Sequence, residues 1–593
     1  MQSQQLLELS RNPVEAYVLN IATHHIFRLA GWRQEVRAPF YSEPQNNVTL
    51  LIENGPGDVR NEWNWNKDAR FSIYVMSLKD GFRTLVKKNV PGIQAVHFFL
   101  TPNGEYVVFY NGEQGNYFSY EISTGVTRNL TVGIKATWKN RNGEDQPVGA
   151  YTPTRMPTFV SNSNCVLLYD RFDIYEVDLS GKIAARNITN GYGQKHHLEF
   201  RLAISSKLGP VDLGRDLILS AFDTSSKEAG FYSVLKGEYR DPQLLSMYAA
   251  KFDYFIEKAK DADIFVLKRM TASNFPNLFF TTDFRKFVPL TNVHPEKKYN
   301  WMTSELLTWK ELDGRITQGV LYKPENFNPR IKYPIIFYYY ERLSDDLHDF
   351  KVPAPSRGTL DIPLYVSNGY LVLTPDIHYT IGYPGRSAYN AVVSAADYVS
   401  KLPFVDAKRM GLQGHSFGGF ETNYIITHTD LFAAAVSASG MSDFVSIYGS
   451  IIGDGTSRQR QYELYRDRIG ATLWDRPDLY IENSPVLRAD KIRTPLLMMA
   501  DANDGDVPWQ QGIELFTALR RLGKKAWMLQ YDGEGHILAS PRAQKDFSLR
   551  MFQFFNHYLK GVRAPTWMTQ GVPGRLKGID TGLELGDTIA AQQ

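Results

Sequence analysis

The chain has 593 residues, which is enough for more than one domain with a large apolar core. Apolar residues make up 43% and charged residues 22%, as in soluble globular proteins. The net charge is only +3 and the sequence has no clustered basic stripe, so nucleic-acid binding is not expected. A single cysteine, Cys165, excludes an intramolecular disulfide and a cysteine-based metal site.

Up to about residue 300, the sequence reads as short strands separated by turns. Each unit has two strands, a turn with glycine and a strand ending in Leu-Thr or a close variant; the units lie at residues 70–81, 104–131, 165–189, 216–234 and 263–291. A repeat of about 40–50 residues with several strands is typical of a β-propeller. We therefore predict a propeller over residues 1–300, with a large β-sandwich as the alternative.

The first repeat is incomplete. Residues 16–23 and 25–29 resemble the last strands of a propeller blade without its first strand. Either a strand from elsewhere closes the circle, or N-terminal sequence is missing from the chain.

From residue 301 onward, strands and helices alternate. Strands are predicted at residues 333–340, 369–375, 409–413, 432–437, 494–500 and 526–531, and helices at 387–401, 420–428, 509–522 and 541–559. This alternation predicts a doubly wound, mostly parallel sheet with helices on both faces.

A nucleophile motif lies between one such strand and the next helix. Residues 414–419 read Gly-His-Ser-Phe-Gly-Gly, which contains the Gly-x-Ser-x-Gly pattern in its expected strand–turn–helix context. The glycines allow the strand and helix to approach closely, and the helix N-terminus offers N–H groups to a developing oxyanion. Ser416 is therefore the predicted nucleophile of an α/β-hydrolase domain over residues 301–593.

A nucleophilic serine needs a base and an orienting acid, which in α/β-hydrolases follow it in the order acid, then histidine. Asp504 follows the strand at 494–500, and His536 follows the strand at 526–531, so both lie at C-terminal strand ends. Asp501 and Asp506 are the competing acids in the same loop. His415, next to the nucleophile, is predicted to point elsewhere.

These motifs resemble the prolyl oligopeptidase family of serine peptidases, including its dipeptidyl and acylaminoacyl peptidases. The matching stretches lie at residues 309–314, 319–324, 332–334, 414–420, 483–486, 494–497, 504–508 and 535–536. The resemblance implies a β-propeller joined to an α/β-hydrolase, with the propeller restricting access so that short peptides are the substrates.

The resemblance also implies roles for further residues. The oxyanion hole would use the Tyr340 hydroxyl and the Phe417 N–H, although Glu341-Arg342 stands where the family often has glycine. The pocket for the residue before the cleaved bond would be lined by apolar side chains, for which ordinary core positions are the alternative: Phe417, Met441, Phe444 and Val507. The paired-glutamate motif of the family's dipeptidyl peptidases is not recognisable.

The predicted function is hydrolysis of peptide bonds in short peptides through a Ser-Asp-His triad and an acyl-enzyme. The alternatives are an esterase or lipase with the same triad, since fold and triad do not separate amides from esters, and a catalytically dead propeller binding protein. No cofactor, metal or nucleic-acid partner is expected. No apolar run approaches the roughly 18–20 residues of a membrane span, so a membrane partner is not expected either. The sequence does not determine the oligomeric state, and a homo-oligomer is one alternative. The sequence leaves two alternatives for the location: the cytoplasm, or the periplasm if an N-terminal signal segment is missing from the chain.

Overall fold

The computed structural model describes residues 15–19, 21, 24–31, 34–37, 46–54, 64–66, 69–92, 97–139, 145, 147, 152–204, 209–237, 240–253, 256–453, 455–576 and 578–586. The chain divides into two compact units. Unit 1 comprises Met1–Met270, Pro276–Val293 and Asp454–Arg466, and unit 2 comprises Thr271–Phe275, His294–Gly453 and Asp467–Gln593. Each unit is described by itself below.

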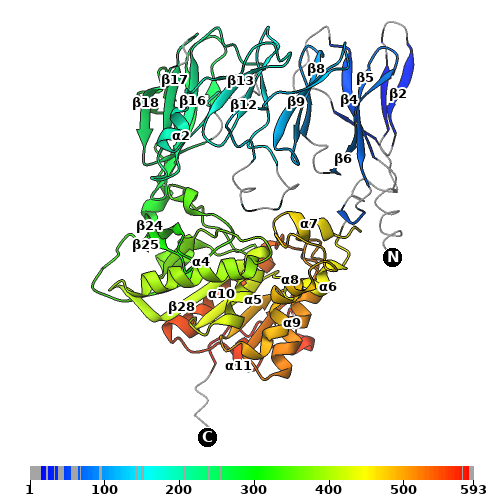
Figure 1. The fold of residues 1–593 in the computed structure, drawn as a ribbon. Helices are drawn as coiled ribbons and strands as arrows, with labels where there is room; N and C mark the ends of the chain where they lie inside the picture. Colours follow the sequence, from blue (N-terminus) through cyan, green and yellow to red (C-terminus); the bar gives the residue numbers. More distant parts are fainter. Residues whose placement is uncertain are drawn as a thin grey trace. The chain divides into compact units, whose positions relative to one another are not determined.

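Unit 1 is built from antiparallel sheets whose strands follow one another along the chain (Figure 1). The first sheets contain β1 (Ala16–Leu19) with β2 (Ile26–Ala30); β3 (Gln34–Arg37), β4 (Val48–Asn54), β5 (Phe71–Ser77) and β6 (Arg83–Val90); and β7 (Phe98–Leu100), β8 (Tyr106–Asn111), β9 (Asn116–Glu121) and β10 (Thr127–Asn129). The next two contain β11 (Thr158–Phe159), β12 (Cys165–Tyr169), β13 (Ile174–Asp178) and β14 (Arg186–Asn187); and, after helix α2 (Tyr192–His196), β15 (Leu198–Leu202), β16 (Leu217–Asp223), β17 (Ala229–Val234) and β18 (Gln243–Tyr248). The last contains β19 (Lys251–Phe252), β20 (Glu257–Lys258), β21 (Phe265–Thr271), β22 (Asn274–Thr281) and β23 (Val288–Pro289).

Consecutive sheets of unit 1 pack on each other through shared apolar cores. Alternate side chains of a strand point to opposite faces, so each sheet contributes to the core on either side of it. The shared cores pair, for example, Leu50 with Val107, Val108 with Leu168, Leu167 with Leu219, and Phe231 with Phe265. Sheets that pack in chain order in this way are propeller blades rather than the two large layers of a sandwich.

Unit 2 contains an eight-stranded sheet in the order β24-β25-β27-β26-β28-β29-β30-β31. The strands are β24 (Met302–Lys310), β25 (Ile316–Pro324), β26 (Tyr333–Tyr338), β27 (Leu371–Pro375), β28 (Val405–His415), β29 (Ala434–Ala438), β30 (Leu496–Met499) and β31 (Ala526–Leu529). Only the first two pairings in this order are antiparallel, and the others are parallel. The mostly parallel sheet predicted from the alternation is therefore present.

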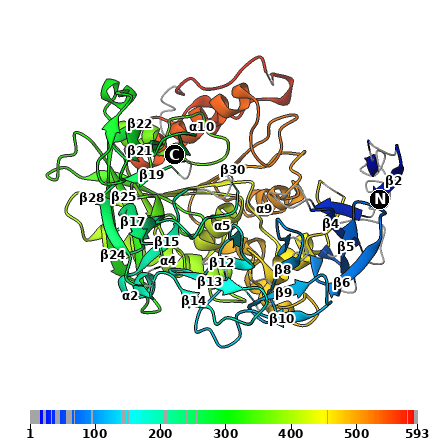
Figure 2. The same cartoon turned by 90° about the horizontal axis from the view of Figure 1, so that it is seen from above.

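Helices cover both faces of this sheet. The helices of unit 2 are α3 (Ile362–Ser367), α4 (Pro384–Ser400), α5 (Phe417–His428), α6 (Phe444–Tyr448), α8 (Pro477–Glu482), α9 (Gln510–Arg521), α10 (Pro541–Lys560) and α11 (Thr566–Thr569), with 3-10 turns η5 (Pro295–Lys298), η6 (Ser344–Asp346), η7 (Pro485–Lys491) and η8 (Gly574–Leu576); α7 (Gln459–Leu464) groups with unit 1. Figure 2 shows α10 on one side of β28 and β30, and α4 and α5 on the other. Tyr365 of α3 packs on Phe555 of α10, so α3 shares the α10 face.

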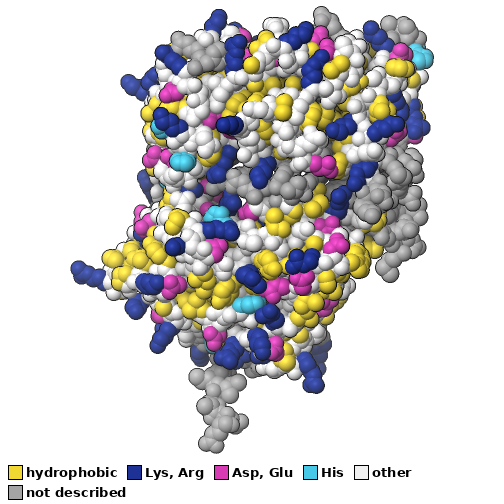
Figure 3. Space-filling model, in the orientation of Figure 1, with side chains coloured by type: hydrophobic (Ala, Val, Ile, Leu, Met, Phe, Trp, Pro, Cys, Tyr) yellow, Lys and Arg dark blue, Asp and Glu magenta, His cyan; other side chains and the backbone are white. Residues whose placement is uncertain are grey.

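The surfaces of both units carry mixed charge. On the face shown in Figure 3, lysine and arginine side chains are interspersed with aspartate and glutamate. Within the described part of the chain, no helix is both long and apolar enough to cross a membrane.

Candidate active site

Ser416 lies at a sharp turn between β28 and α5. Its φ is 60° and its ψ is −118°, a backbone conformation that costs a non-glycine residue of order 1–3 kcal/mol. A Cβ on Gly414 would lie 2.0 Å from the Gly418 carbonyl oxygen, so strand and helix can meet this closely only with glycine. The motif therefore forms the strained elbow that the sequence predicted, with the serine at the N-terminus of a twelve-residue helix.

The two other predicted triad residues lie within hydrogen-bond distance of one another and of Ser416. His536 Nε2 lies 2.8 Å from Ser416 Oγ, and His536 Nδ1 lies 2.8 Å and 3.0 Å from the two carboxylate oxygens of Asp504. The Asp504 Oδ1 atom also accepts the backbone N–H groups of Asp506 and Val507, each at 2.8 Å. These bonds orient the carboxylate toward His536, which can then hold its Nδ1 proton and present Nε2 to the serine hydroxyl.

The competing acids have other roles in the described structure. Asp501 is fully buried, and its Oδ1 accepts the Tyr531 N–H at 2.6 Å. Burial raises the pKa of Asp501 to about 6. Asp506 contributes its backbone N–H to Asp504, as described above. Asp504 is hydrogen-bonded to His536 through both of its carboxylate oxygens.

His415 lies closer to the site than the sequence suggested. Its Nε2 is 2.9 Å from the His536 carbonyl oxygen, and the two imidazole rings are 5.0 Å apart between centroids. A carbonyl oxygen only accepts, so His415 Nε2 carries a proton. Burial lowers the pKa of His415 to about 4, so the ring is neutral at pH 7. His415 thus supports the backbone of the loop that carries His536.

Tyr340 follows the end of β26 and lies beside the start of α5. A Cβ on Gly418 would be 2.7 Å from the Tyr339 carbonyl oxygen and 3.7 Å from a ring carbon of Tyr340. The ring of Tyr340 thus borders the turn that carries Ser416. Phe417, the first residue of α5, has its N–H directly after the serine. The two predicted oxyanion donors therefore come from neighbouring backbone segments.

The four predicted pocket residues are all buried, with exposed fractions between 0% and 8%. The rings of Phe417 and Phe444 both pack against Phe420, at centroid distances of 5.4 Å and 4.8 Å. The carbonyl of Met441 accepts from Asn423 of α5, and Val507 donates its N–H to Asp504. Phe417, Met441 and Phe444 therefore lie around α5, whereas Val507 lies in the loop of Asp504.

Three residues around Tyr340 were not singled out from the sequence. The Tyr379 hydroxyl lies 2.8 Å from the Tyr340 carbonyl oxygen and 2.5 Å from Glu421 Oε1, and the guanidinium of Arg468 lies over the Tyr379 ring. Glu421 carried a usable signal, because a glutamate among the buried residues of α5 needs a specific partner.

No group of three or more histidine, cysteine, aspartate or glutamate side chains in the described residues is arranged to hold a metal ion.

Residues 379–562 match the family model described as the Prolyl oligopeptidase family. The similar curated proteins include an uncharacterized peptidase, YuxL, of Bacillus subtilis, 29% identical over 235 residues that cover 38% of this chain and 34% of the relative. They also include dipeptidyl-peptidase 5 of Porphyromonas gingivalis, 24% identical over 289 residues that cover 46% of this chain and 39% of the relative. The chain thus spans between a third and two fifths of the length of these relatives.

Solved structures extend the likeness to nearly the whole chain. Porphyromonas gingivalis dipeptidyl peptidase 4 has a TM-score of 0.68 and 15% identity, covering 92% of this chain and 80% of that protein. Pyrococcus horikoshii acylaminoacyl peptidase has a TM-score of 0.54 and 15% identity, covering 92% of this chain and 85% of that protein. The predicted resemblance and the predicted combination of a propeller with an α/β-hydrolase are therefore confirmed.

Proposed function

We propose that this chain is a serine peptidase of the prolyl oligopeptidase family and that it cleaves short peptides through an acyl-enzyme on Ser416. The observation that supports the proposal most directly is the line of hydrogen bonds from Asp504 through His536 to Ser416. The family match and the names of the similar peptidases support the peptide substrate.

The geometry supports the following sequence of steps. Ser416 Oγ attacks the carbonyl carbon of the scissile bond while its proton passes to His536 Nε2, and Asp504 stabilises the resulting imidazolium. The carbonyl oxygen becomes an oxyanion that accepts hydrogen bonds from the Phe417 N–H and the Tyr340 hydroxyl. His536 then donates its Nε2 proton to the leaving amine as the C–N bond breaks.

Hydrolysis of the acyl-enzyme repeats these roles with water. His536 Nε2 takes a proton from the water as its oxygen attacks the ester carbon, and returns it to Ser416 Oγ as the ester bond breaks. The strained backbone at Ser416 holds Oγ at the start of α5 in both steps.

The test is labelling with a serine-directed fluorophosphonate, followed by turnover of a peptide library and of matched esters. We expect Ser416→Ala to abolish labelling and peptide turnover, while Ser400→Ala, a change on the exposed side of α4, leaves both intact. Labelling that survives Ser416→Ala contradicts the nucleophile. Turnover of esters without any peptide cleavage contradicts the peptidase and supports the esterase alternative.

The preferred residue before the scissile bond is proposed to be uncharged, apolar or proline. The walls predicted for its pocket, Phe417, Met441, Phe444 and Val507, carry no charge, so a charged side chain would lose its hydration without gaining a partner. Peptides that differ only at this position, with Ala, Pro, Phe, Glu and Lys, measure the preference. A higher kcat/KM for Glu or Lys contradicts the apolar pocket.

A further inference from the structure

A buried acid lies on the nucleophile helix, five residues after Ser416. Glu421 is completely buried, and its Oε1 is 2.5 Å from the Tyr379 hydroxyl. The same hydroxyl lies 2.8 Å from the carbonyl oxygen of Tyr340. One tyrosine therefore connects the interior of α5 with the peptide group that follows the Tyr340 side chain.

The number of available protons decides which groups donate in the two hydrogen bonds of Tyr379. A tyrosine hydroxyl donates one hydrogen bond, and the Tyr340 carbonyl can only accept. Both contacts are hydrogen bonds only if Tyr379 donates to Tyr340 and Glu421 donates to Tyr379, which requires a protonated Glu421.

The surroundings of Glu421 also favour the protonated form. Burial raises the pKa of this carboxyl well above its usual range, and its second oxygen has no hydrogen-bond partner among the described residues. The nearby cation, Arg468, already donates from Nη2 to Glu341 at 3.1 Å. An ionised Glu421 would lose its hydration for a single hydrogen bond, which is unfavourable.

Arg468 adds a second set of contacts to the same peptide segment. Its guanidinium carbon lies 4.0 Å from the centroid of the Tyr379 ring, and its side chain is 2% exposed. By pairing with Glu341, it holds the residue next to Tyr340. A cation above an aromatic face and a nearly buried ion pair both restrict the rotamers of the groups involved.

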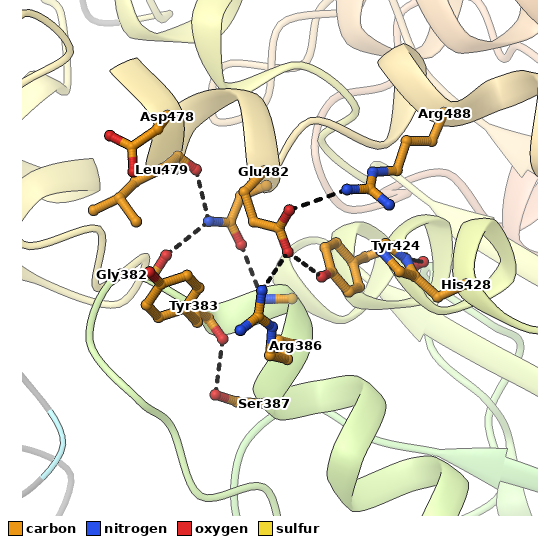
Figure 4. A network of polar contacts seen from close by, with 12 residues as sticks. Gly382, Tyr383, Arg386, Ser387, Tyr424, His428, Asp478, Leu479, Glu482 and Arg488 are labelled. Atoms are coloured by element: carbon orange, nitrogen blue, oxygen red, sulfur yellow. Dashed lines mark hydrogen bonds and ion pairs between the residues drawn. The ribbon is translucent and has the colours of Figure 1, made fainter. Parts of the chain in front are cut away.

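The backbone around Arg468 is itself anchored. The Arg468 carbonyl accepts the Gly382 N–H at 2.7 Å, and the Gly382 carbonyl accepts from the Asn483 amide at 2.9 Å. Figure 4 shows this anchoring region, where Glu482 also binds Arg386, Arg488 and the Tyr424 hydroxyl. The contacts to Tyr340 and Glu341 thus originate in a rigidly bonded part of unit 2.

We infer that Tyr379, Glu421 and Arg468 are positioning residues that hold the Tyr340–Glu341 segment and thereby aim the Tyr340 hydroxyl at the oxyanion. The inference rests on the proposed function and extends it to residues that the triad and the oxyanion donors do not include. Tyr340 lies just beyond β26, where the sheet ladder no longer holds its backbone. Because a displacement of about 1 Å can cost 10²-fold in rate, this segment needs additional contacts.

The first experiment is a double-mutant cycle. We expect Tyr379→Phe to lower kcat about 10-fold with little change in KM, and to lower it less than about 2-fold further in a Tyr340→Phe background, because it acts through Tyr340. Tyr370→Phe is the matched control: it also removes a buried tyrosine hydroxyl that donates to a side-chain oxygen, that of Asn556 on α10, and we expect kcat to be unchanged. An unchanged kcat in Tyr379→Phe, or an equal loss in both backgrounds, overturns the inference.

The second experiment tests the protonated acid. Glu421→Gln keeps the shape and a donor for Tyr379, so we expect kcat within about 3-fold of the wild type, whereas Glu421→Met should fall about as far as Tyr379→Phe. Equal losses for Gln and Met contradict a neutral donor at this position. Thermal unfolding of each variant shows whether a loss reflects folding instead.

The outcomes separate this inference from the proposed function. Fluorophosphonate labelling also builds charge on an oxygen in the oxyanion hole, so its rate constant provides a readout that does not require a peptide substrate. If the wild-type protein is labelled but cleaves no peptide, the proposed peptidase function is contradicted. The double-mutant cycle can then still be measured through the rate constant of labelling. If the wild-type protein is labelled and also cleaves peptides, but Tyr379→Phe lowers kcat equally with and without Tyr340→Phe, only this inference is contradicted.

Discussion

Two aspartates, one in each unit, show how the same local chemistry serves different ends. In unit 1, Asp178 closes the turn after β13 by accepting the N–H groups of Ser180, Lys182 and Ile183 and the Ser180 hydroxyl. In unit 2, Asp504 accepts two backbone N–H groups of its own loop and also contacts His536. Backbone donors hold both carboxylates.

The two carboxylates differ in the groups that they contact besides these backbone N–H groups. Burial opposes ionisation of Asp178, but hydrogen bonds from the Ser180 hydroxyl and the backbone lower its pKa below the ordinary value. These bonds stay within one turn, so they stabilise that turn. Asp504 directs its oxygens at a histidine from a different loop, and this contact suits it to the orienting role proposed for it. An aspartate turn is therefore a catalytic candidate only where a distant titratable group reaches it.

The largest expected effect is the difference in kcat between variants of the two aspartates. We expect Asp504→Asn to leave the fold intact and to lower kcat by about 10⁴-fold, because the histidine tautomer is no longer held. Asp178→Asn should leave kcat unchanged. Initial rates with the best library peptide provide the measurement. A harmless Asp504→Asn together with a crippling Asp501→Asn would show that the neighbouring acid has this role.

The next effect concerns the oxyanion. We expect Tyr340→Phe to lower kcat by on the order of 10²-fold, or about 3 kcal/mol, with little change in KM, because the hydroxyl contacts charge that exists only in the transition state. Steady-state kinetics on one peptide measure both constants. Unchanged turnover would assign this donor to another group.

The next prediction concerns the contribution of Asp178 to the stability of unit 1. Asp178→Ala removes the acceptor of three backbone N–H groups and one hydroxyl, so we expect unit 1 to lose roughly 2–3 kcal/mol of stability. Ser180→Ala, which removes one hydroxyl, should cost less. Calorimetric unfolding measures both variants, and an equal loss in the two would contradict the role of the carboxylate.

The smallest effect is a pH dependence at Asp501. Its folded-state pKa of about 6 lies above the ordinary 3.8, so its contribution to stability is complete below about pH 4 and is lost as the pH rises through about 6. Asp501→Asn keeps the acceptor for Tyr531 and removes this loss. We expect the variant to gain about 1–2 kcal/mol on the wild type between pH 4 and pH 7.5, measured by thermal unfolding. A pH-independent difference would contradict the raised pKa.

Local sequence patterns were enough to predict most of the longer elements and the motif residues. The apolar runs and the helical spacing predicted six strands of unit 2, β26 to β31, and its helices α4, α5, α9 and α10 to within a few residues; α10, for example, spans Pro541–Lys560 against the predicted 541–559. The sequence analysis did not predict β24, β25 or the short helices α3, α6, α8 and α11. Ser416, Asp504 and His536 were also recognisable, because each follows a strand in a loop whose local pattern is itself informative. The repeated units predicted the blades for the same reason, since each blade is built from consecutive strands.

Which side chains meet across those elements depends on the fold. The direction of the His415 ring and the contacts of Glu421 with Tyr379 and of Arg468 with Glu341 join segments far apart in the chain. A local pattern encodes which face of an element is buried, but the partner on that face depends on strand order and on how loops pack at the sheet edge. The three candidate triad residues could therefore be named from the sequence, whereas the contacts proposed to hold the Tyr340–Glu341 segment are visible only in the fold.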